Sequence, residues 1–453
     1  MTPQQEQQYA KQFGAAKNGR VASGVAKKQG GNGANTPVSE PNKAKKWKSI
    51  GLAAAVIGPG LMVMLADTDA GSIITAAQSG AQWGYTMVLP QLILIPILYV
   101  VQEITVRLGI VTGEGHGALI RDHFGMGWAM VSVITLFVAC IGALVTEFAG
   151  IAGVAQMFHI PLYVSVPIVT ALLVMVGLSG SYRRVEKIGI AVGLLELLFI
   201  VAAIMAKPDL HAMASGLTHF PIGQGNYLFL LAANVGAVIM PWMVFYQQGA
   251  VIDKRLQRKD TKLELWDTKI GAVLTQIIMV AVVVTTAVGI HSVNPNTVLN
   301  DVQDVTTALT PALGETGVIL FALGIAGAGF LAALVVSLAG AWGISEAFRM
   351  KHSLNLPPSK AKGFYSLYTL AHVAGAAIVL LGIPLINLVV DVEVMNAILL
   401  PIVLGFLLLL ERVALPKEYR MSGARKYIVW SLCGIVISFG LYTAAKSFMD
   451  FVG

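Results

Sequence analysis

Two aspartates and a serine stand inside a segment of the sequence that is otherwise hydrophobic. The run ADTDAGS, residues 66–72, contains Asp67, Asp69 and Ser72, and it follows a GPG triplet at residues 58–60. A charged side chain at the centre of a membrane helix costs about 3 kcal/mol on insertion scales, so residues of this kind usually serve a function. Carboxylate and hydroxyl oxygens at this depth are suitable ligands for a hard cation.

A second apolar segment carries residues that interrupt a helix. Gly236 is followed by AVIMP, in which Pro241 removes a backbone hydrogen bond and Gly236 loosens the turn. Backbone carbonyls that are freed in this way become available to a ligand. An ordinary kink is the alternative interpretation for this segment, whereas a kink alone does not explain the carboxylates of residues 66–72.

The elements that must hold these residues are membrane helices. Hydrophobic residues make up 56% of the 453 residues and charged residues 12%, and the mean hydropathy is +0.73. A soluble domain carries about twice this charged fraction. A bilayer core needs about 20 apolar residues per helix, and runs of that kind predict about eleven transmembrane helices in an all-α protein. They lie near residues 50–80, 85–107, 127–156, 160–178, 188–206, 226–248, 270–291, 317–348, 364–383, 385–411 and 427–449.

The distribution of Lys and Arg predicts the orientation. With a cytoplasmic N-terminus, all of the 31 Lys and Arg residues except Lys207 and Lys446 lie in the N-terminal segment or in cytoplasmic loops. Cytoplasmic loops carry such an excess. We therefore expect a multi-pass protein of the cytoplasmic membrane with its C-terminus outside.

Residues 1–48 differ from the remainder of the chain. They are polar, rich in Gly, Ala, Gln and Lys, and without an apolar run, so we expect a disordered basic cytoplasmic tail. Residues 49–453 are predicted to form one transmembrane domain. Neither part has the pattern of a nucleic-acid-binding module, and the two cysteines, Cys140 and Cys433, suit neither a metal cluster nor a disulfide framework.

The two interrupted segments hold the first place in each of two five-helix halves. Residues 50–206 would form the first repeat and residues 226–411 the second, with residues 427–449 as an extra helix. Paired broken helices at equivalent positions are typical of inverted-repeat transporters, whose site lies near the membrane midplane.

Several stretches of the sequence resemble the Nramp family of divalent metal transporters. GPGLMVMLADTDAGS is similar to the first helix of that family, where GPG precedes D-P-G-N, and ANVGAVIMPW is similar to its A-x-x-M-P-H motif in the sixth helix. The stretches EITVRLGIVTGEGHGALIRDHFG (103–125) and SYRRVEKI (181–188) resemble two of its helix connections. The resemblance extends from about residue 50 to the end of the tenth predicted span.

This resemblance implies a LeuT-like (APC-like) fold that holds a metal ion between the unwound parts of the first and sixth helices. By position it implies that Asp69 is the anionic ligand and that Ser72 replaces the family's asparagine. It also implies a backbone carbonyl from Ala237, with Ala66 as a further candidate, and the thioether of Met240. Residues that would line the pathway around this site are Asp67, Glu147, Gly236 and Trp242.

The sequence departs from the family pattern in ways that predict a wider site with fewer protein ligands. Trp242 stands where the family has a histidine, Gly150 where a second carboxylate is expected, and Leu399 at a glutamine position; Phe330, Leu331 and Ala332 replace a polar stretch in the eighth helix. Mg2+ keeps several waters and binds through one or two carboxylates. The pattern is similar to the Nramp-related magnesium transporters, so we expect Mg2+, and also Mn2+, as the transported ion, without proton coupling. Met240 argues the other way, because a thioether favours transition metals.

Other embedded polar residues have structural interpretations. Glu103 and Arg107, four residues apart, are expected to form an ion pair. Glu196 is interpreted as a paired structural carboxylate, and His291 and His372 as histidines with hydrogen-bond partners near span ends. Residues 292–316 are interpreted as a solvated outer loop. Asp67 either adds negative potential to the site or is hydrogen-bonded to another helix.

Three other functions remain open. They are a proton-coupled Mn2+/Fe2+ importer, a carrier of an organic substrate on the same fold, and a membrane protein that transports nothing. An ion channel is disfavoured because no repeated filter segment is visible. An enzyme is disfavoured because the chain has no nucleotide-binding loop and no triad pattern, and no cofactor is expected.

Overall fold

The computed structural model describes residues 56–295, 297, 299, 302–381 and 388–452, so the predicted tail lies outside the described residues. Every regular element in these ranges is a helix, as expected where lipid cannot satisfy backbone polar groups. The helices up to residue 216 are α3 (Pro59–Asp67), α4 (Ala70–Trp83), η1 (Gly84–Met87), α5 (Val88–Thr112), α6 (His116–Phe124), α7 (Met126–Met157), α8 (Leu162–Gly177), α9 (Tyr182–Gly193), η2 (Leu194–Leu197), α10 (Leu198–Met205) and α11 (Leu210–Gly216). Those that follow are α12 (Gly225–Val238), α13 (Pro241–Asp253), η3 (Arg258–Asp260), α14 (Thr261–Thr286), η4 (Ala287–His291), α15 (Val302–Ala347), α16 (Lys362–Leu380), α17 (Leu388–Val413), η5 (Lys417–Tyr419) and α18 (Gly423–Val452).

Nine helical stretches in the described part of the chain are long and apolar enough to cross a membrane. The sequence predicted about eleven spans, and the two numbers differ because of two places in the chain. The stretch 70–112 contains the second part of the predicted span 50–80 and all of the span 85–107, which separate at Gly84, where φ is +57°. The predicted span 160–178 corresponds to α8, which is apolar but has only 16 residues. All eleven predicted positions therefore contain helix.

The first and sixth predicted spans are both interrupted. Between α3 and α4, Thr68 and Asp69 leave the helical conformation, and Asp69 caps the N-terminus of α4. Between α12 and α13, Ile239 and Met240 are non-helical, and α13 begins at Pro241, where the missing N–H costs nothing. These breaks confirm that the apolar runs at residues 50–80 and 226–248 are not continuous helices.

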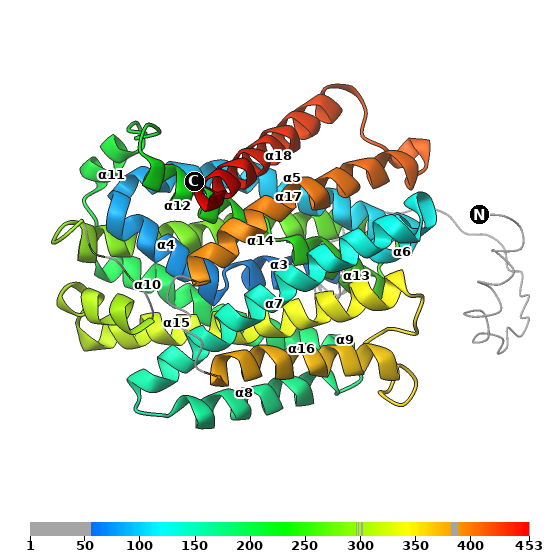
Figure 1. The fold of residues 1–453 in the computed structure, drawn as a ribbon, viewed down its shortest axis with the longest axis horizontal. Coiled ribbons are helices and arrows are strands. Elements are labelled where there is room, and N and C mark those ends of the chain that lie inside the picture. The colour runs from blue at the N-terminus through cyan, green and yellow to red at the C-terminus, as the bar shows by residue number, and fades with distance from the viewer. Residues whose placement is uncertain (1–55, 296, 298, 300–301, 382–387, 453) are drawn as a thin grey trace, which may run out of the picture. The chain divides into compact units, whose positions relative to one another are not determined.

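The broken first helix lies inside the bundle. Helices α3 and α4 both contact α14 and α15, and α4 also contacts α7, α12 and α17 (Figure 1). Every residue from Met62 to Ala81 is buried. Close packing requires small residues here: a Cβ atom on Gly60 would lie 2.6 Å from the backbone nitrogen of Thr268 on α14.

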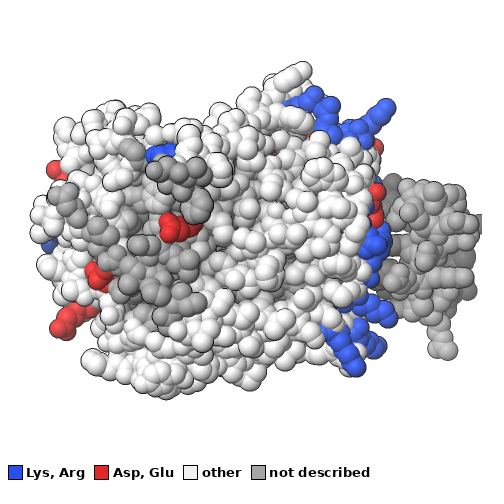
Figure 2. All heavy atoms as spheres, in the orientation of Figure 1, with Lys and Arg blue, Asp and Glu red and all other residues white. Residues whose placement is uncertain are grey.

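The surface agrees with a membrane environment. Figure 2 shows a broad face almost free of charged side chains, with Lys and Arg gathered toward one end of the described part. Large apolar side chains are exposed on many helices, among them Ile134, Phe137, Tyr163 and Ile204, at 54–71% of their surface. Exposed apolar area on this scale is favourable in lipid and not in water. The protein is an integral membrane protein.

The prediction of a solvated outer loop over residues 292–316 was wrong in part. Helix α15 already begins at Val302, and its kink lies at Gly314, where φ is +66°. Val302, Val305 and Leu309 are buried at helical spacing, so an apolar stripe holds this segment on the bundle.

Candidate functional site

Asp69 occupies the break in the first helix. Its Oδ1 accepts a hydrogen bond from the backbone N–H of Ser72 at 2.6 Å, which is the usual N-cap geometry. The side chain is completely buried, and Oδ2 has no hydrogen-bond partner in the described structure. One oxygen therefore fixes the carboxylate in position while the other is left available.

A hydrogen bond joins the two interrupted helices. The hydroxyl of Ser72 donates to the carbonyl oxygen of Ala237 at 2.9 Å, so two predicted ligands contact each other. Gly236, one residue earlier, lies against the backbone of Glu393 on α17 and has no room for a side chain. Ser72 and Ala237 are 165 residues apart in the sequence, and their hydrogen bond lies beside Asp69 in the structure.

Glu147 on α7 also reaches the break. Its Oε2 accepts a hydrogen bond from the N–H of Ala70 at 3.0 Å, and its side chain is fully buried. One turn further along α7, a Cβ atom on Gly150 would lie 2.5 Å from the Cβ of Ala70. A carboxylate at position 150 therefore has no space beside Ala70, and Glu147 is the acidic residue that α7 contributes.

The thioether of Met240 is already engaged by a neighbour. The indole N–H of Trp242 donates to Met240 Sδ at 3.0 Å, and both side chains are buried. A sulfur lone pair used in this hydrogen bond is less available to a soft metal ion. Trp242 thus does more than replace a protonatable side chain, because it also changes what Met240 offers.

Glu393 is a site residue that the sequence analysis missed. A Cβ atom built on Gly71 would lie 2.5 Å from Glu393 Oε1 and 3.5 Å from Asp69 Oδ1, so the two carboxylates flank the start of α4. Oε2 of Glu393 accepts from the amide of Asn396 at 3.0 Å, but Oε1 has no partner. The rule that singled out Asp69, a carboxylate within an apolar span, applies equally to Glu393 in the run at residues 385–411.

Asp67 and Ala66 lie in the last turn of α3, both buried. Among the described residues neither carboxylate oxygen of Asp67 has a hydrogen-bond partner, which disagrees with the interpretation that this aspartate is bonded to another helix. The prediction that Glu196 is a paired structural carboxylate was also wrong, because both of its oxygens are without a partner in the described residues.

Five buried carboxylates therefore surround the break in the first helix: Asp67, Asp69, Glu147, Glu196 and Glu393. The charge of Asp69 acts on each of the other four. None of the five takes part in the ion pairs found among the described residues. A buried carboxyl group is costly to ionise without a partner, so a cation that enters this cluster stabilises the charged form of the groups beside it.

These carboxylates do not form a closed metal centre. Within the described ranges no group of three or more His, Cys, Asp or Glu side chains is close enough to hold a metal ion together. An ion beside Asp69 would depend on one or two carboxylates, backbone oxygens and water. This arrangement resembles the coordination that Mg2+ prefers.

On one side of the site, polar side chains connect three helices. Asn234 on α12 donates to Ser79 on α4 at 2.7 Å and accepts from Gln91 on α5 at 2.5 Å. All three residues are completely buried. These hydrogen bonds hold the second half of the first helix against the first half of the sixth.

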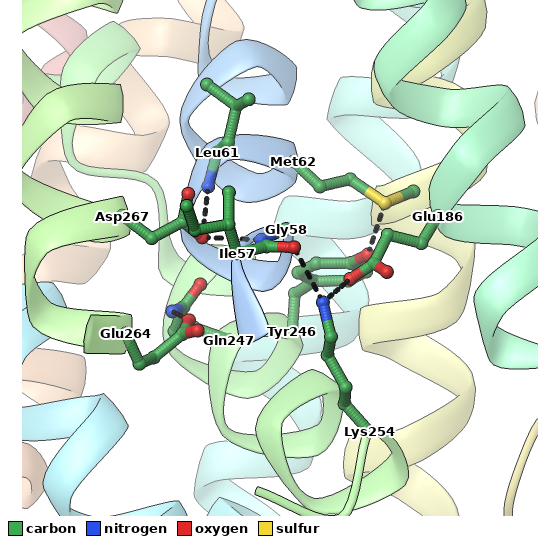
Figure 3. Close-up of polar contacts among 10 residues, drawn as sticks. All are labelled: Ile57, Gly58, Leu61, Met62, Glu186, Tyr246, Gln247, Lys254, Glu264 and Asp267. Atoms are coloured by element: carbon green, nitrogen blue, oxygen red, sulfur yellow. Dashed lines mark hydrogen bonds and ion pairs between the residues drawn. The ribbon is translucent and has the colours of Figure 1, made fainter. Parts of the chain in front are cut away.

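On the other side, the beginning of α3 is held by charged residues (Figure 3). Lys254 Nζ bonds to Glu186 Oε1 at 2.7 Å and to the carbonyl of Ile57 at 2.8 Å. Asp267 Oδ2 accepts from the N–H groups of Gly58 at 2.8 Å and Leu61 at 3.1 Å. With both sets of contacts present, the site residues are enclosed from both directions.

Two structural interpretations were confirmed. Glu103 and Arg107 form an ion pair at 3.6 Å, and Arg425 on α18 joins them. His372 bonds to the hydroxyl of Ser337 at 3.2 Å and to the carbonyl of Tyr368 at 3.0 Å, so it is a satisfied histidine. Its predicted place near a span end was wrong, because it lies in the middle of α16 and is completely buried.

Two helices broken at a shared, acidic and enclosed site define this protein as a membrane protein of the LeuT-like fold. The Nramp model, described as natural resistance-associated macrophage protein-like, matches residues 60–446. The chain belongs to the Nramp family.

Relatives and solved structures agree with this assignment. The divalent metal cation transporter MntH of Klebsiella pneumoniae (strain 342) is 25% identical over 300 residues, which cover 63% of this chain and 70% of that protein. MntH of Yersinia pestis (strain Pestoides F) is 27% identical over 295 residues, 63% and 71% of the two chains.

Among solved structures, a manganese transporter of Eremococcus coleocola superposes with a TM-score of 0.75 at 20% identity, over 92% of this chain and 91% of that one. A Na+-coupled sialic acid symporter reaches a TM-score of 0.55 at 16% identity, covering 86% and 89%. These likenesses establish the shared fold.

Proposed function

We propose that this protein imports divalent metal ions, with Mg2+ as the main substrate and Mn2+ as a second one. The observation that carries the proposal is the cluster of five buried carboxylates without a cationic partner among the described residues, centred on the free Oδ2 of Asp69. The family and the MntH relatives support a divalent metal as the class of substrate.

The preference for Mg2+ rests on the chemistry of the ligands. The Met240 sulfur is engaged by Trp242, so the groups that remain are hard oxygen donors. Leu331 of α15 offers no oxygen and packs against Gly193, where a Cβ atom would lie 2.5 Å from its Cδ2. A site with few protein ligands leaves space for the waters that Mg2+ releases reluctantly.

The absence of proton coupling is supported by Trp242 on α13, the second half of the broken sixth span, and by His116 on α6, which contacts α13. Trp242 cannot carry a proton. His116 packs against Phe245 and bonds to Gln248, and burial lowers the pKa of His116 to about 4. This histidine is therefore neutral at physiological pH and has no proton to release. A proton-coupled Mn2+/Fe2+ importer is the alternative function.

An organic anion is a poor fit to this site. A carrier of the same fold that binds a carboxylate presents the N-terminus of a broken helix to it. Here the first amides of α4 are used by the chain itself, Ala70 N–H by Glu147 and Ser72 N–H by Asp69. The N-terminus of α13 begins with Pro241, which has no N–H.

Purified protein in proteoliposomes tests this function, with fluorescent reporters for Mg2+, Mn2+ and internal pH. We expect Mg2+ entry without acidification, lost in Asp69→Ala. The matched control is Asp391→Asn, which removes an exposed carboxylate of α17 and should transport normally. Entry of Mn2+ with acidification and no Mg2+ flux would favour the proton-coupled importer. Uptake that is undiminished in Asp69→Ala would contradict the assigned site.

We also infer that the N-terminus is cytoplasmic and the C-terminus external. The excess of Lys and Arg in alternate loops supports this orientation. A protease site added at the N-terminus should be cut in inverted membrane vesicles and protected in intact cells.

A further inference from the structure

Two carboxylates of the cluster, Asp67 and Glu196, form none of the hydrogen bonds that hold Asp69 and the start of α4. Asp67 is 1% exposed and Glu196 is not exposed at all, and all four of their oxygens lack a hydrogen-bond partner in the described structure. A buried carboxyl group without a partner takes up a proton, and it keeps its charge only when it is paired or binds a cation. Both side chains are therefore charged only when a cation from outside the chain lies beside them.

The packing of two helices places Glu196 beside the end of α3. A Cβ atom on Gly189 of α9 would lie 2.5 Å from Met62, and one on Gly193 would lie 3.1 Å from Leu65. Helices α9 and α3 therefore run side by side, and moving about one turn along α9 corresponds to moving about one turn along α3. The next turn brings Glu196 to the level of Thr68, directly after Asp67.

Thr68 supplies a hydroxyl between the two carboxylates and α14. Its Oγ1 lies 2.7 Å from Oγ1 of Thr275, which also bonds to the carbonyl of Met64. The electrostatic interactions of Glu196 include the hydroxyl of Thr68 and the charges of Asp67 and Asp69. The Thr68 hydroxyl and the carboxylates of Asp67 and Glu196 therefore lie close enough to act on one another.

The end of α3 adds a second, independent reason for a cation. Helix α3 ends at Asp67, and its C-terminal carbonyls carry the negative end of the helix dipole. The hydrogen bonds that Ser72 gives to Asp69 and Ala70 gives to Glu147 hold the start of α4, on one side of the break. Asp67 and Glu196 lie on the other side, at the end of α3.

We propose that Asp67, Glu196 and the Thr68 hydroxyl form a second cation site next to the transport site, selective for a hard divalent ion. Two carboxylates match the charge of a divalent ion, and all of the donors are oxygens. The inference rests on the proposed function only for the identity of the ion, which is the same Mg2+ or Mn2+ that the protein carries. The second site holds one ion while Asp69 holds another.

Binding of Mn2+ to the purified protein in detergent, measured by equilibrium dialysis and by the loss of the free Mn2+ electron paramagnetic resonance signal, tests this site. We expect two ions per wild-type chain, one in Asp69→Asn, one in Glu196→Gln and none in the double variant. The matched control is Glu346→Gln, a buried carboxylate that accepts a hydrogen bond from Gly117 N–H on α6. This control should still bind two ions.

Three results would overturn the proposal: one ion per wild-type chain, no loss of binding in Glu196→Gln, or a site in Asp69→Asn that takes Na+ and not Mn2+. If Mg2+ uptake is absent from proteoliposomes but two Mn2+ ions still bind, the proposed function fails and the second site stands. If Mg2+ uptake is normal but only one Mn2+ ion binds, the second site fails and the proposed function stands.

Thermal unfolding shows whether the variants are folded. Without ions, Glu196→Gln should unfold at the same temperature as the wild type or higher, since it removes an unpaired buried carboxylate. In the Asp69→Asn background, Mn2+ should raise the unfolding temperature only when Glu196 is intact. Asp67→Asn provides a second route to the same loss of binding if Glu196→Gln aggregates.

Discussion

At the scale of single residues, the neighbours of each ligand decide which ions it accepts. Met240 would favour a transition metal on its own, yet the indole N–H of Trp242 is bonded to its sulfur. Ser72 is likewise engaged with the carbonyl of Ala237. The atoms left without partners around Asp69 are carboxylate oxygens, which are hard donors.

Substituting Trp242 with Phe should make the protein more selective for soft ions. The change removes the N–H and leaves the Met240 sulfur free, while the aromatic ring still fills most of the volume. We expect Cd2+ uptake to rise relative to Mg2+ uptake by about tenfold, equivalent to about 1.4 kcal/mol. Competition of the two ions in proteoliposomes measures this ratio. The gain should disappear in the double variant Trp242→Phe, Met240→Ala; a gain that persists there would mean that the sulfur is not responsible.

Substituting Glu393 with Gln should weaken divalent ion transport. The side chain keeps its size and its contact with Asn396, but the negative charge beside Asp69 is lost. We expect an apparent affinity for Mg2+ that is lower by about tenfold or more. Asp391→Asn, two residues away on the same helix and exposed, is the control for loss of charge alone. Equal effects of the two substitutions would argue against a role for Glu393 at the site.

At the scale of elements, the GPG triplet positions α3 through two close approaches. Gly58, at φ +151°, packs against Glu186 and Lys254, and Gly60 packs against the backbone of α14 at Thr268. No other residue fits these contacts without displacement of its neighbours. The short helix that ends at Asp67 therefore depends on α9, α13 and α14 for its position.

Substituting Gly60 with Ala should destabilise the protein and reduce transport. Its Cβ atom would lie 2.6–2.8 Å from the backbone and hydroxyl of Thr268, and overpacking of this kind costs about 1–3 kcal/mol. Thermal unfolding in detergent measures the change. Gly405→Ala on α17 is the control, because a Cβ atom there meets nothing within 4 Å. An unfolding temperature for Gly60→Ala equal to that of the control would show that α3 can move away without cost.

Substituting Lys254 with Met should loosen the beginning of α3. The substitution removes the bonds to Glu186 and to the Ile57 carbonyl and leaves Glu186 without its cation. We expect faster hydrogen–deuterium exchange in the segment 57–67. Arg349→Met, which breaks an ion pair with Asp122 that is half exposed, should leave this segment unchanged. Exchange that is the same in both variants would indicate that Asp267 alone holds α3.

At the scale of the whole molecule, transport of a divalent ion without a proton moves two charges across the membrane. An interior potential of 100 mV therefore favours entry by about 4–5 kcal/mol. This driving force suffices for uptake and needs neither a nucleotide nor a second ion.

Uptake should accordingly depend on the membrane potential. Proteoliposomes that carry K+ and valinomycin allow the potential to be set, and Mg2+ influx should increase as the interior becomes more negative. Internal pH should not change during Mg2+ influx, because no proton accompanies the ion. Influx that follows the pH gradient and not the potential would identify the proton-coupled alternative.

Much of the fold could be predicted from the sequence because lipid imposes simple rules. Apolar runs of about 20 residues must be helices, so composition and length predicted the membrane class and the eleven helical segments. Gly58, Pro241 and the aspartates marked the two breaks because local residues decide where a helix can continue. The start of α15 at Val302 was missed because amphipathic packing, not hydropathy, holds it in place.

The availability of each ligand was decided by the tertiary structure. The hydrogen bond from Trp242 to Met240, the position of Glu393 beside Gly71 and the missing partners of Glu196 all depend on side-chain geometry. The bond between Ser72 and Ala237 joins residues 165 positions apart. The sequence by itself therefore determined the class of protein, the breaks in its helices and Asp69 as the anionic residue at its centre. Which oxygens and which sulfur remain free for an ion follows only from how the helices pack, because a donor's strength depends on its neighbours in space.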